Sequence, residues 1–359
     1  MRSLLTRLPV LVALVAGAFL LSACDSSDTG TDAITIDDIN TDTILNSEAT
    51  NVILATYEDL EAEAQALDAA VQTFVADRTD ANLQAAQDAW ISTRTPWESS
   101  ESFLFGPVAE DDLDPALDSW PVDENSIQSI LDSNQDITVS FVNNLGTNSK
   151  GFHTIEFLLF GPNGGKTPAD FTDRDIEYLT SATAVLANDT EALASAWRPG
   201  EGGFATEFAD AQTQVAQNPK AALDVLAEGM EIIADEVGTG KIGTPLDDGT
   251  IARIESKYSE NSFTDFINNI RSIRSIYTGD YAGNSGPGLD DVVGAVNPDL
   301  DARVKSEIET AIQSLEDIPL SFRASVEQNQ LGPVQDAQQA ILDIRNTVTS
   351  DIRPLINNL

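Results

Sequence analysis

Apolar side chains recur along this chain at steps of three and four residues, which is the spacing of one face of an α-helix. The first such stripe consists of Ile53, Tyr57, Leu60, Ala64, Leu67, Val71 and Phe74. Later stripes are Leu179, Leu186, Leu193 and Trp197; Leu223, Leu226, Met230, Ile233 and Val237; Val304, Ile308, Ala311 and Leu315; and Ile341, Ile344, Val348, Ile352 and Leu355. Period-two strands with hairpin signals are almost absent. The pattern therefore predicts an all-α fold.

Clusters of glycine, proline and aspartate divide this pattern into separate helices. They lie at residues 106–121, 161–170, 199–203, 238–249 and 279–298. About eight helices fall between these expected loops, and the cluster after Trp197 lies near the middle of the chain. We therefore expect two packed helical bundles of the four-helix type, residues 46–200 and 201–359. The two halves are expected to be pseudo-symmetric, although their sequences resemble each other only faintly.

The first 45 residues predict export and a lipid anchor. Arg2 and Arg7 precede an apolar stretch, and Leu21-Ser22-Ala23-Cys24 resembles a lipobox. We interpret residues 1–23 as a lipoprotein signal peptide and Cys24 as the lipidated residue; an ordinary secretory signal beside a chance cysteine is the alternative. Residues 24–45 are acidic and predict a flexible tether. The expected location is the cell envelope, lipid-anchored and periplasmic or surface-exposed, with inner and outer membrane both open.

Charge narrows the range of partners. The chain has 59 acidic and 19 basic residues, a formal net charge of -40, which repels phosphate backbones and excludes nucleic acid as an expected partner. The carboxylates either gather cations or solvate a protein that works in concentrated salt. The scarcity of lysine, six against thirteen arginines, favours the second interpretation. Cys24 is the only cysteine, so we expect neither a disulfide nor a thiolate metal site in the mature chain.

The only histidine, His153, lies in a strongly apolar stretch with Glu156 three positions further on. On a helix these two residues share a face. Asn148 or Ser149 is expected to cap this helix, and Gly161-Pro162 to end it. The helix N-terminus favours a neutral imidazole, the form that binds metal. On spacing alone, however, a lone histidine in a core is more often a structural residue than a ligand.

A second motif runs from Trp90 to Pro107. In a helical conformation its residues Arg94, Trp97, Glu98, Glu101 and Phe105 lie along one stripe. Pro96 cannot donate a backbone hydrogen bond, so the helix is expected to start or kink there. The alternative interpretation makes the aromatic residues part of the core and pairs the two glutamates with the arginine or with solvent.

Three motifs together carry a family resemblance. They are Gly151-x-His153-x-x-Glu156, Arg94-x-x-Trp97-Glu98-x-x-Glu101-x-Phe103-x-Phe105-Gly106, and Asp118-Ser119-Trp120-Pro121. In combination they resemble the imelysin-like family of bacterial envelope proteins, over most of residues 46–359. The resemblance implies two related helical bundles with the His-Glu motif near their junction. It also implies a link to iron-regulated uptake and metal binding, and the family carries a metallopeptidase label.

The motifs and the resemblance together give a candidate metal site. We expect His153 and Glu156 as first ligands, and Glu98 and Glu101 as additional oxygen donors. The residues expected to line or orient the site are Arg94, Trp97, Asp118, Trp120 and Gly151. A set with many oxygens and one nitrogen suits iron, with manganese, calcium and zinc left open.

The expected function is the binding of iron, or of an iron-bearing ligand, for uptake. The membrane, through the N-terminal lipid, and iron-transport components are the expected partners. One alternative is a metallopeptidase with Glu156 as the catalytic residue, but zinc hydrolases normally use several imidazoles and this chain has one. The other alternative is a non-catalytic scaffold or adhesion lipoprotein. Neither a Gly-x-Ser-x-Gly motif nor a phosphate-binding loop is present in the sequence.

Overall fold

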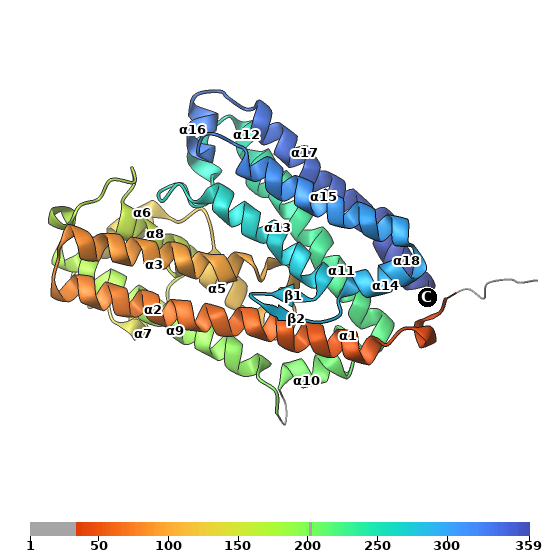
Figure 1. Cartoon of the computed structure of the whole chain (residues 1–359). Helices are drawn as coiled ribbons and strands as arrows, with labels where there is room; N and C mark the ends of the chain where they lie inside the picture. Colours follow the sequence, from red (N-terminus) through yellow and green to blue (C-terminus); the bar gives the residue numbers. More distant parts are fainter. Residues whose placement is uncertain (1–33, 201–202) are drawn as a thin grey trace, which may run out of the picture. The chain divides into compact units, whose positions relative to one another are not determined.

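The computed structural model describes residues 34–200 and 203–359, where the protein is all-α apart from one short hairpin (Figure 1). The predicted fold class is therefore confirmed. The expected signal peptide, Cys24 and the first part of the expected tether lie outside the described residues. Within the two described ranges, no helix combines the length and the apolar character that crossing a bilayer requires.

Four long helices from the first half of the chain form one bundle. They are α2 (Ala55–Ala76), α3 (Asp80–Glu98), α8 (Gly151–Phe160) and α9 (Asp173–Trp197). Helix α2 packs along both α3 and α9, and α8 packs on α3 and α9 from the other side (Figure 1). The predicted stripe from Ile53 to Phe74 is fully buried, so it forms the inner face of α2 and of the turn before it.

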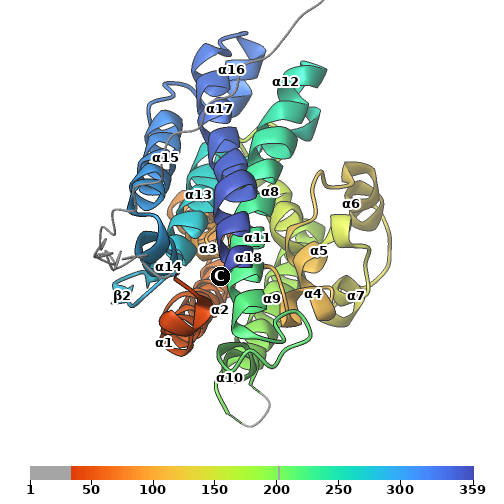
Figure 2. The ribbon, with the colours of Figure 1, turned by 90° about the vertical axis from the view of Figure 1, so that its right-hand side faces the viewer.

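Four helices from the second half form a comparable bundle. They are α11 (Pro219–Asp235), α13 (Ser262–Thr278), α15 (Pro298–Glu316) and α17 (Gly332–Thr347). Helices α11 and α15 each pack on both α13 and α17 (Figure 2). The two groups of helices meet where α3 packs on α13, and where η3 (Glu101–Phe103) packs on α11. One continuous hydrophobic core runs through both groups.

Shorter elements connect these helices. The short α-helices are α1 (Thr41–Ser47), α4 (Pro107–Glu110), α5 (Leu113–Asp118), α6 (Glu124–Leu131), α7 (Val139–Asn143), α10 (Phe204–Ala209), α12 (Thr244–Asp248), α14 (Leu289–Val296), α16 (Phe322–Glu327) and α18 (Arg353–Asn358). The 3₁₀ turns besides η3 are η1 (Ile36–Asp38), η4 (Thr147–Ser149), η5 (Pro168–Asp170) and η7 (Ile251–Arg253). Three π-helical segments are η2 (Glu48–Leu54), η6 (Glu236–Gly243) and η8 (Val348–Ile352). The hairpin is antiparallel, with β1 (Asp280–Tyr281) paired to β2 (Asn284–Ser285).

Capping side chains explain where the long helices begin. The Thr172 side chain accepts a hydrogen bond from the Asp175 N–H, and Asp175 accepts from the Thr172 N–H, which is a capping box at the start of α9. Asn218 and Asn297 each accept a backbone hydrogen bond, and each is followed by a proline at the first helical position of α11 or α15. These residues satisfy N–H groups that have no partner inside the helix.

Helical structure begins earlier than the sequence predicts. Helix α1 starts at Thr41, Leu45 is fully buried, and the Ile36 N–H donates to the Leu359 carbonyl at 3.3 Å. Residues 34–45 therefore pack on the helical body, and the expectation of a flexible tether is corrected for them. The reason is that the isoleucines and Leu45 in this acidic stretch supply enough apolar surface to dock it.

Two further expectations about the helices are corrected. Helix α3 begins at Asp80 and passes through Pro96 before ending at Glu98. Of the two expectations for Pro96, a helix start or a kink, the start is therefore wrong. The expected loop at 238–249 is helical instead, because η6 joins α11 directly to α12. A Cβ on Gly238 would lie 2.6 Å from Leu342 Cδ2 on α17. This glycine therefore permits close helix packing rather than a turn.

Candidate metal centre

The predicted residues of the second motif meet Asp118 at the end of α5. Arg94 and Glu98 lie one turn apart on α3, and both are fully buried. The Arg94 guanidinium forms ion pairs with the carboxylates of Glu98 and Asp118. The Trp97 indole N–H donates to Asp118 Oδ2 at 2.6 Å. Helix α3 therefore fixes Asp118 through one cation and one neutral donor.

Gly151 brings α8 close to α5. Its φ is +75°, and a Cβ at this position would lie 2.3 Å from the Leu117 carbonyl oxygen, which no side chain tolerates. This close approach places the first turn of α8 beside Asp118. The expected cap by Asn148 or Ser149 is wrong, because Lys150 occupies the N-cap position without a side-chain cap. The helix ends at Gly161 as predicted, with φ +72°.

His153 lies in that first turn with both ring nitrogens near carboxylates. Its Nδ1 is 3.0 Å from Glu156 Oε2, and its Nε2 is 3.0 Å from Asp118 Oδ1. Glu156 Oε1 accepts three hydrogen bonds, from the N–H groups of Tyr258 and Ser259 and from the Ser259 hydroxyl. Glu156 is thus fixed on the far side of the ring from Asp118. Glu156 and Asp118 thus contact different nitrogens of the same ring.

The second half of the chain supplies site residues that sequence reasoning missed. Glu255, just after η7, has Oε1 3.7 Å from His153 Nε2 and 3.2 Å from an Arg94 nitrogen. Asp265 on α13 lies 3.4 Å from the same arginine. One turn later, the Asn269 amide donates to Glu98 Oε2 at 2.5 Å. The sequence could have indicated Asp265 and Asn269, because these two polar residues lie one helical turn apart beside the apolar positions of α13. Nothing in the sequence distinguishes Glu255.

Lys241 on η6 completes the set of buried charges. Its ammonium lies 3.4 Å from Glu98 Oε2 and 3.2 Å from Glu255 Oε2, with its side chain 1% exposed. The structure also brings Glu101, on η3, to this centre, because oxygens of Glu98, Glu101 and Asp118 lie within 4.8 Å of one another. Every residue predicted for the site in the described part of the chain therefore lies at or beside one buried cluster.

The carboxylates of this cluster differ in how their charge is compensated. Burial alone would raise the pKa of Asp118, but Arg94, His153 and Lys241 hold it well below its usual range. Burial raises the pKa of Asp265 to about 6 despite the nearby Arg94. The cations therefore hold Asp118 in its ionised form, whereas they offset the effect of burial on Asp265 only in part.

The neighbours of His153 favour a protonated ring in the protein alone. Burial by itself would lower its pKa, but the carboxylates of Asp118, Glu156 and Glu255 raise it well above its usual value. The expectation of a neutral ring at the helix N-terminus is therefore wrong. Neighbouring carboxylates outweigh the helix dipole, whose effect is about 1 kcal/mol. A metal ion on Nε2 would have to displace this proton.

Access to the centre is narrow. A small space of about 10 Å³ reaches His153 and Glu156 between Trp120, Ile254 and Tyr258. That is about the volume of one probe-sized water. Trp120 is partly exposed, and its indole N–H donates to the Arg253 carbonyl at 3.2 Å, which fixes the ring at this entrance. An ion or a water fits this space, whereas a polypeptide does not.

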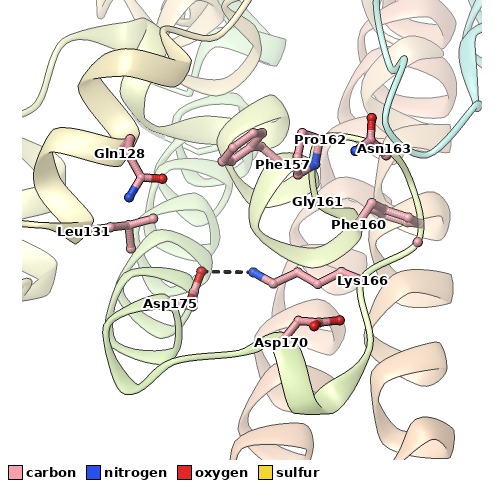
Figure 3. A pocket seen from close by; sticks show the side chains of 11 residues that line it. Gln128, Leu131, Phe157, Phe160, Gly161, Pro162, Asn163, Lys166, Asp170 and Asp175 are labelled. Carbon is pink, nitrogen blue, oxygen red and sulfur yellow. Dashed lines mark hydrogen bonds and ion pairs between the residues drawn. The ribbon is translucent and has the colours of Figure 1, made fainter.

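A larger cavity lies at the other end of α8 and does not contain the buried cluster. It has a volume of about 380 Å³, and Phe157 and Phe160 contribute to its wall (Figure 3). Its Lys166 ammonium is paired with Asp175 at 2.9 Å, as the dashed line in Figure 3 marks. Neither His153 nor Glu156 lines this cavity. Its size therefore gives no reason to place the metal chemistry there.

The donor groups present fit a metal ion. His153 Nε2 and Glu255 Oε2 are both buried without a hydrogen bond of acceptable geometry among the described residues. One donor atom each from Asp118, His153 and Glu255 lies within 4.8 Å of the others. One imidazole with two carboxylates is a set that binds iron, manganese or zinc. The protein also holds the ring from behind, as metal-binding histidines require.

Comparison with known proteins agrees with the fold and the motifs. The imelysin family matches residues 53–348. The chain is 28% identical to iron-regulated protein A of Synechococcus elongatus over 315 residues, covering 85% of this chain and 84% of that protein. A solved structure described as an iron-regulated protein A precursor, from Parabacteroides distasonis, superposes with a TM-score of 0.82 at 27% identity, covering 91% of this chain and 97% of that one.

A second solved structure supports the fold alone. It is an imelysin-like protein from Psychrobacter arcticum, with a TM-score of 0.70 at 15% identity, covering 90% of this chain and 98% of that one. The family match spans most of both helical bundles, including Arg94, Asp118, His153 and Glu255. The chain belongs to the imelysin family.

Proposed function

We propose that this protein binds a single metal ion, iron, at the buried centre and serves iron uptake at the cell envelope. The observation that carries the proposal is the buried meeting of one ring nitrogen with two carboxylates: His153 Nε2 lies 3.0 Å from Asp118 Oδ1 and 3.7 Å from Glu255 Oε1, without a well-formed hydrogen bond to any described residue. A ring nitrogen in that position needs either a proton or a metal ion. The excess of carboxylates around it favours a cation.

Each nearby residue has a distinct part in this proposal. His153, Asp118 and Glu255 hold the ion, while Glu156 orients the imidazole through Nδ1. Arg94 forms ion pairs with Asp118 and Glu255. It is the main cation that lowers the pKa of Asp118, whereas Lys241 is the main one at Glu255. The ion supplies positive charge at the point where these carboxylates converge.

Iron is the proposed ion for two reasons. A mixed set of one imidazole and two carboxylates suits iron better than calcium, which prefers oxygen alone. The relatives from Synechococcus elongatus and Parabacteroides distasonis are both called iron-regulated protein A, and a name given for regulation by iron favours a role in iron supply. Manganese and zinc are the competing ions in the test below.

The geometry supports ion binding over peptide cleavage. A metallopeptidase must place a peptide bond beside its metal, but the space next to His153 is only about 10 Å³. A scaffold lipoprotein, the other alternative, needs no buried ion-pair network at all. Removing these charged groups from water costs free energy, and replacing them by apolar residues would often be neutral or stabilising. The presence of the network therefore favours a functional role over a purely structural one.

The proposal places the protein on the envelope through its N-terminus. The lipobox-like Leu21-Ser22-Ala23-Cys24 is the reason for proposing a lipid on Cys24. Anchored in this way, the helical domain faces the compartment through which iron enters, and components of iron transport are its proposed partners. Mass spectrometry of the membrane fraction tests the lipid: an unmodified Cys24 in the mature protein contradicts the anchor.

Metal content tests the central claim. Mature protein, stripped with chelator and reloaded with ferrous iron, manganese or zinc in separate dialyses, is expected to retain about one iron per chain by elemental analysis. His153→Ala removes the nitrogen donor and should abolish retention, while Glu156→Gln should weaken affinity about 10- to 100-fold by loosening the ring.

Glu191→Gln is the matched control, because Glu191 is exposed on α9 far from this cluster in the chain. It should bind as the wild type does. Circular dichroism must first show that each variant remains helical. Equal iron retention by wild type and His153→Ala sinks the proposed site, and tighter retention of zinc or manganese than of iron sinks the choice of metal.

A further inference from the structure

The buried centre contains a second group of oxygens besides the proposed ion site. Carboxylate oxygens of Glu98, Glu101 and Asp118 lie within 4.8 Å of one another. Asp118 also belongs to the group with His153 and Glu255, so the two groups share one residue. Such a shared carboxylate is the arrangement of centres that hold two metal ions side by side.

The position next to this second group is taken by an ammonium. Lys241 Nζ lies 3.4 Å from Glu98 Oε2, 3.3 Å from Glu255 Oε1 and 3.2 Å from Glu255 Oε2. Its side chain is 1% exposed, and Glu101, Glu236 and Asp118 are the further acids that act on its charge. The nitrogen is thus enclosed by carboxylates from both halves of the chain.

The backbone delivers Lys241 to this position through a π-helical segment. Segment η6 continues α11 without a break, and π-helical turns shift the direction of the side chains that follow them. The Trp120 ring lies 5.5 Å from Nζ and closes the other side. These neighbours hold the lysine stem in place, so the ammonium is a fixed part of the centre.

One oxygen of the centre has fewer partners than its burial requires. Glu255 Oε2 is fully buried and forms no well-formed hydrogen bond with any described residue, although Lys241 Nζ is 3.2 Å away. Glu255 Oε2 therefore interacts with Lys241 through charge rather than through a well-formed hydrogen bond, as a carboxylate does with a metal ion. Glu101 also acts on the charge of Lys241.

We infer that the Lys241 ammonium occupies the position of a second metal ion, so that the centre holds one exchangeable ion and one covalently attached cation. This inference rests on the proposed function, because it assumes that the His153 side binds the first ion. An ammonium and a divalent ion in the same group of oxygens repel each other strongly at low dielectric. Lys241 therefore sets the metal stoichiometry of the centre at one.

Removing this ammonium is the direct test. In Lys241→Met the stem is replaced by an apolar side chain, which leaves Glu98, Glu101, Asp118 and Glu255 without their ammonium. The variant is expected to retain about two iron ions per chain where the wild type retains one, measured by elemental analysis after dialysis against buffered ferrous iron. Lys241→Arg keeps the positive charge and should retain one.

A second variant locates the added ion. Glu101→Gln combined with Lys241→Met removes one oxygen donor of the second group only, and the count should return to about one. Lys241→Gln, which still donates hydrogen bonds to Glu98 or Glu255, is expected to take up a second ion as Lys241→Met does. If either lysine variant unfolds in chelator, its melting temperature should recover on adding metal, because the new ion replaces the lost charge.

The outcomes separate this inference from the proposed function. Wild type that retains no iron contradicts the proposed function itself. Wild type that retains one, together with lysine variants that also retain one, leaves the first ion site intact and overturns the role of Lys241. Wild type that retains two buried ions at saturating iron overturns it as well, and so do lysine variants that stay unfolded in saturating metal.

Discussion

Two of the regions in which the protein buries carboxylates treat them in opposite ways. At the centre between the bundles, Asp118 is 7% exposed and contacts both Arg94 and His153. On η2, Glu48 is fully buried, and neither of its oxygens has a hydrogen-bond partner among the described residues. Its charged neighbours, Asp290 and Asp280, are themselves acids.

The comparison separates the effect of burial from the effect of partners. Burial raises the pKa of both groups, because water solvates an ionised carboxylate better than protein does. At Asp118 the nearby cations reverse this shift, whereas at Glu48 the neighbouring acids add to it. A buried carboxylate is thus a candidate ligand only where compensating cations keep it ionised. That criterion selects Asp118 and rejects Glu48.

The largest expected effect comes from removing Arg94, a cation that compensates the buried carboxylates of the centre. Arg94→Met leaves Glu98, Asp118, Glu255 and Asp265 buried with less compensation, and we expect the free energy of unfolding to fall by about 3–5 kcal/mol. Urea denaturation in the presence of chelator measures this loss. The carboxylates of the centre would then have one compensating cation fewer, which brings their situation closer to that of Glu48.

The matched control is a surface arginine. Arg303 forms an ion pair with Asp351 at 2.5 Å, but its side chain is 49% exposed. Arg303→Met should therefore cost about 0–1 kcal/mol, because solvent screens the pair. Similar losses in the two variants would mean that the buried network contributes no more than a surface pair, and the contrast drawn above would fail.

Much of the fold is predictable because long helices bury regular apolar stripes. The stripes around Ile53, Leu223 and Val304 all lie in the core, and they define helices in both bundles. Local spacing also predicted that Arg94 and Glu98 share one face of α3, and that His153 and Glu156 share one face of α8. Their assignment to a metal site came from the family resemblance, because spacing alone favours a structural role for a lone histidine.

The remaining site residues depend on contacts that local spacing does not encode. Glu255 reaches Arg94 across 161 positions of sequence, and Lys241 reaches Glu98 across 143. Lys241 and Glu48 also lie on π-helical segments, where the spacing of 3.6 residues no longer applies. For that reason the stretch around Lys241, with its three glycines, resembled a loop.

A smaller effect is expected from the glycine that positions α8. In Gly151→Ala the Cβ would lie 2.3 Å from the Leu117 carbonyl oxygen at a φ of +75°, so α8 must shift away from α5. We expect a loss of about 1–3 kcal/mol from backbone strain, with weaker iron binding because His153 and Asp118 separate. Thermal unfolding and elemental analysis measure the two effects.

Gly165→Ala is the control for that variant, because a Cβ at Gly165 meets nothing within 4 Å. It should leave both melting temperature and iron content unchanged. If Gly151→Ala loses stability but keeps full iron binding, the close approach of α8 to α5 is structural only. The centre would then owe its geometry to the ion pairs of Arg94 rather than to the helix crossing.

The smallest expected effect concerns Glu48, the buried carboxylate whose charged neighbours are acids. Glu48→Gln replaces a buried acid without partners by a neutral amide of the same shape, and at pH 7 the variant should be more stable than wild type by about 1 kcal/mol. The sign follows from the raised pKa of Glu48: the folded state holds its proton more tightly than the unfolded chain. The stability that this proton contributes is complete below the pKa of Glu48 in the unfolded chain, and it is lost as the pH rises through the pKa of Glu48 in the folded protein.

The advantage of Glu48→Gln should therefore grow between pH 4 and pH 8 in melting experiments, while exposed Glu191→Gln shows no such trend. A variant less stable than wild type at every pH would mean that Glu48 has a compensating partner, and the contrast with Asp118 would then be wrong.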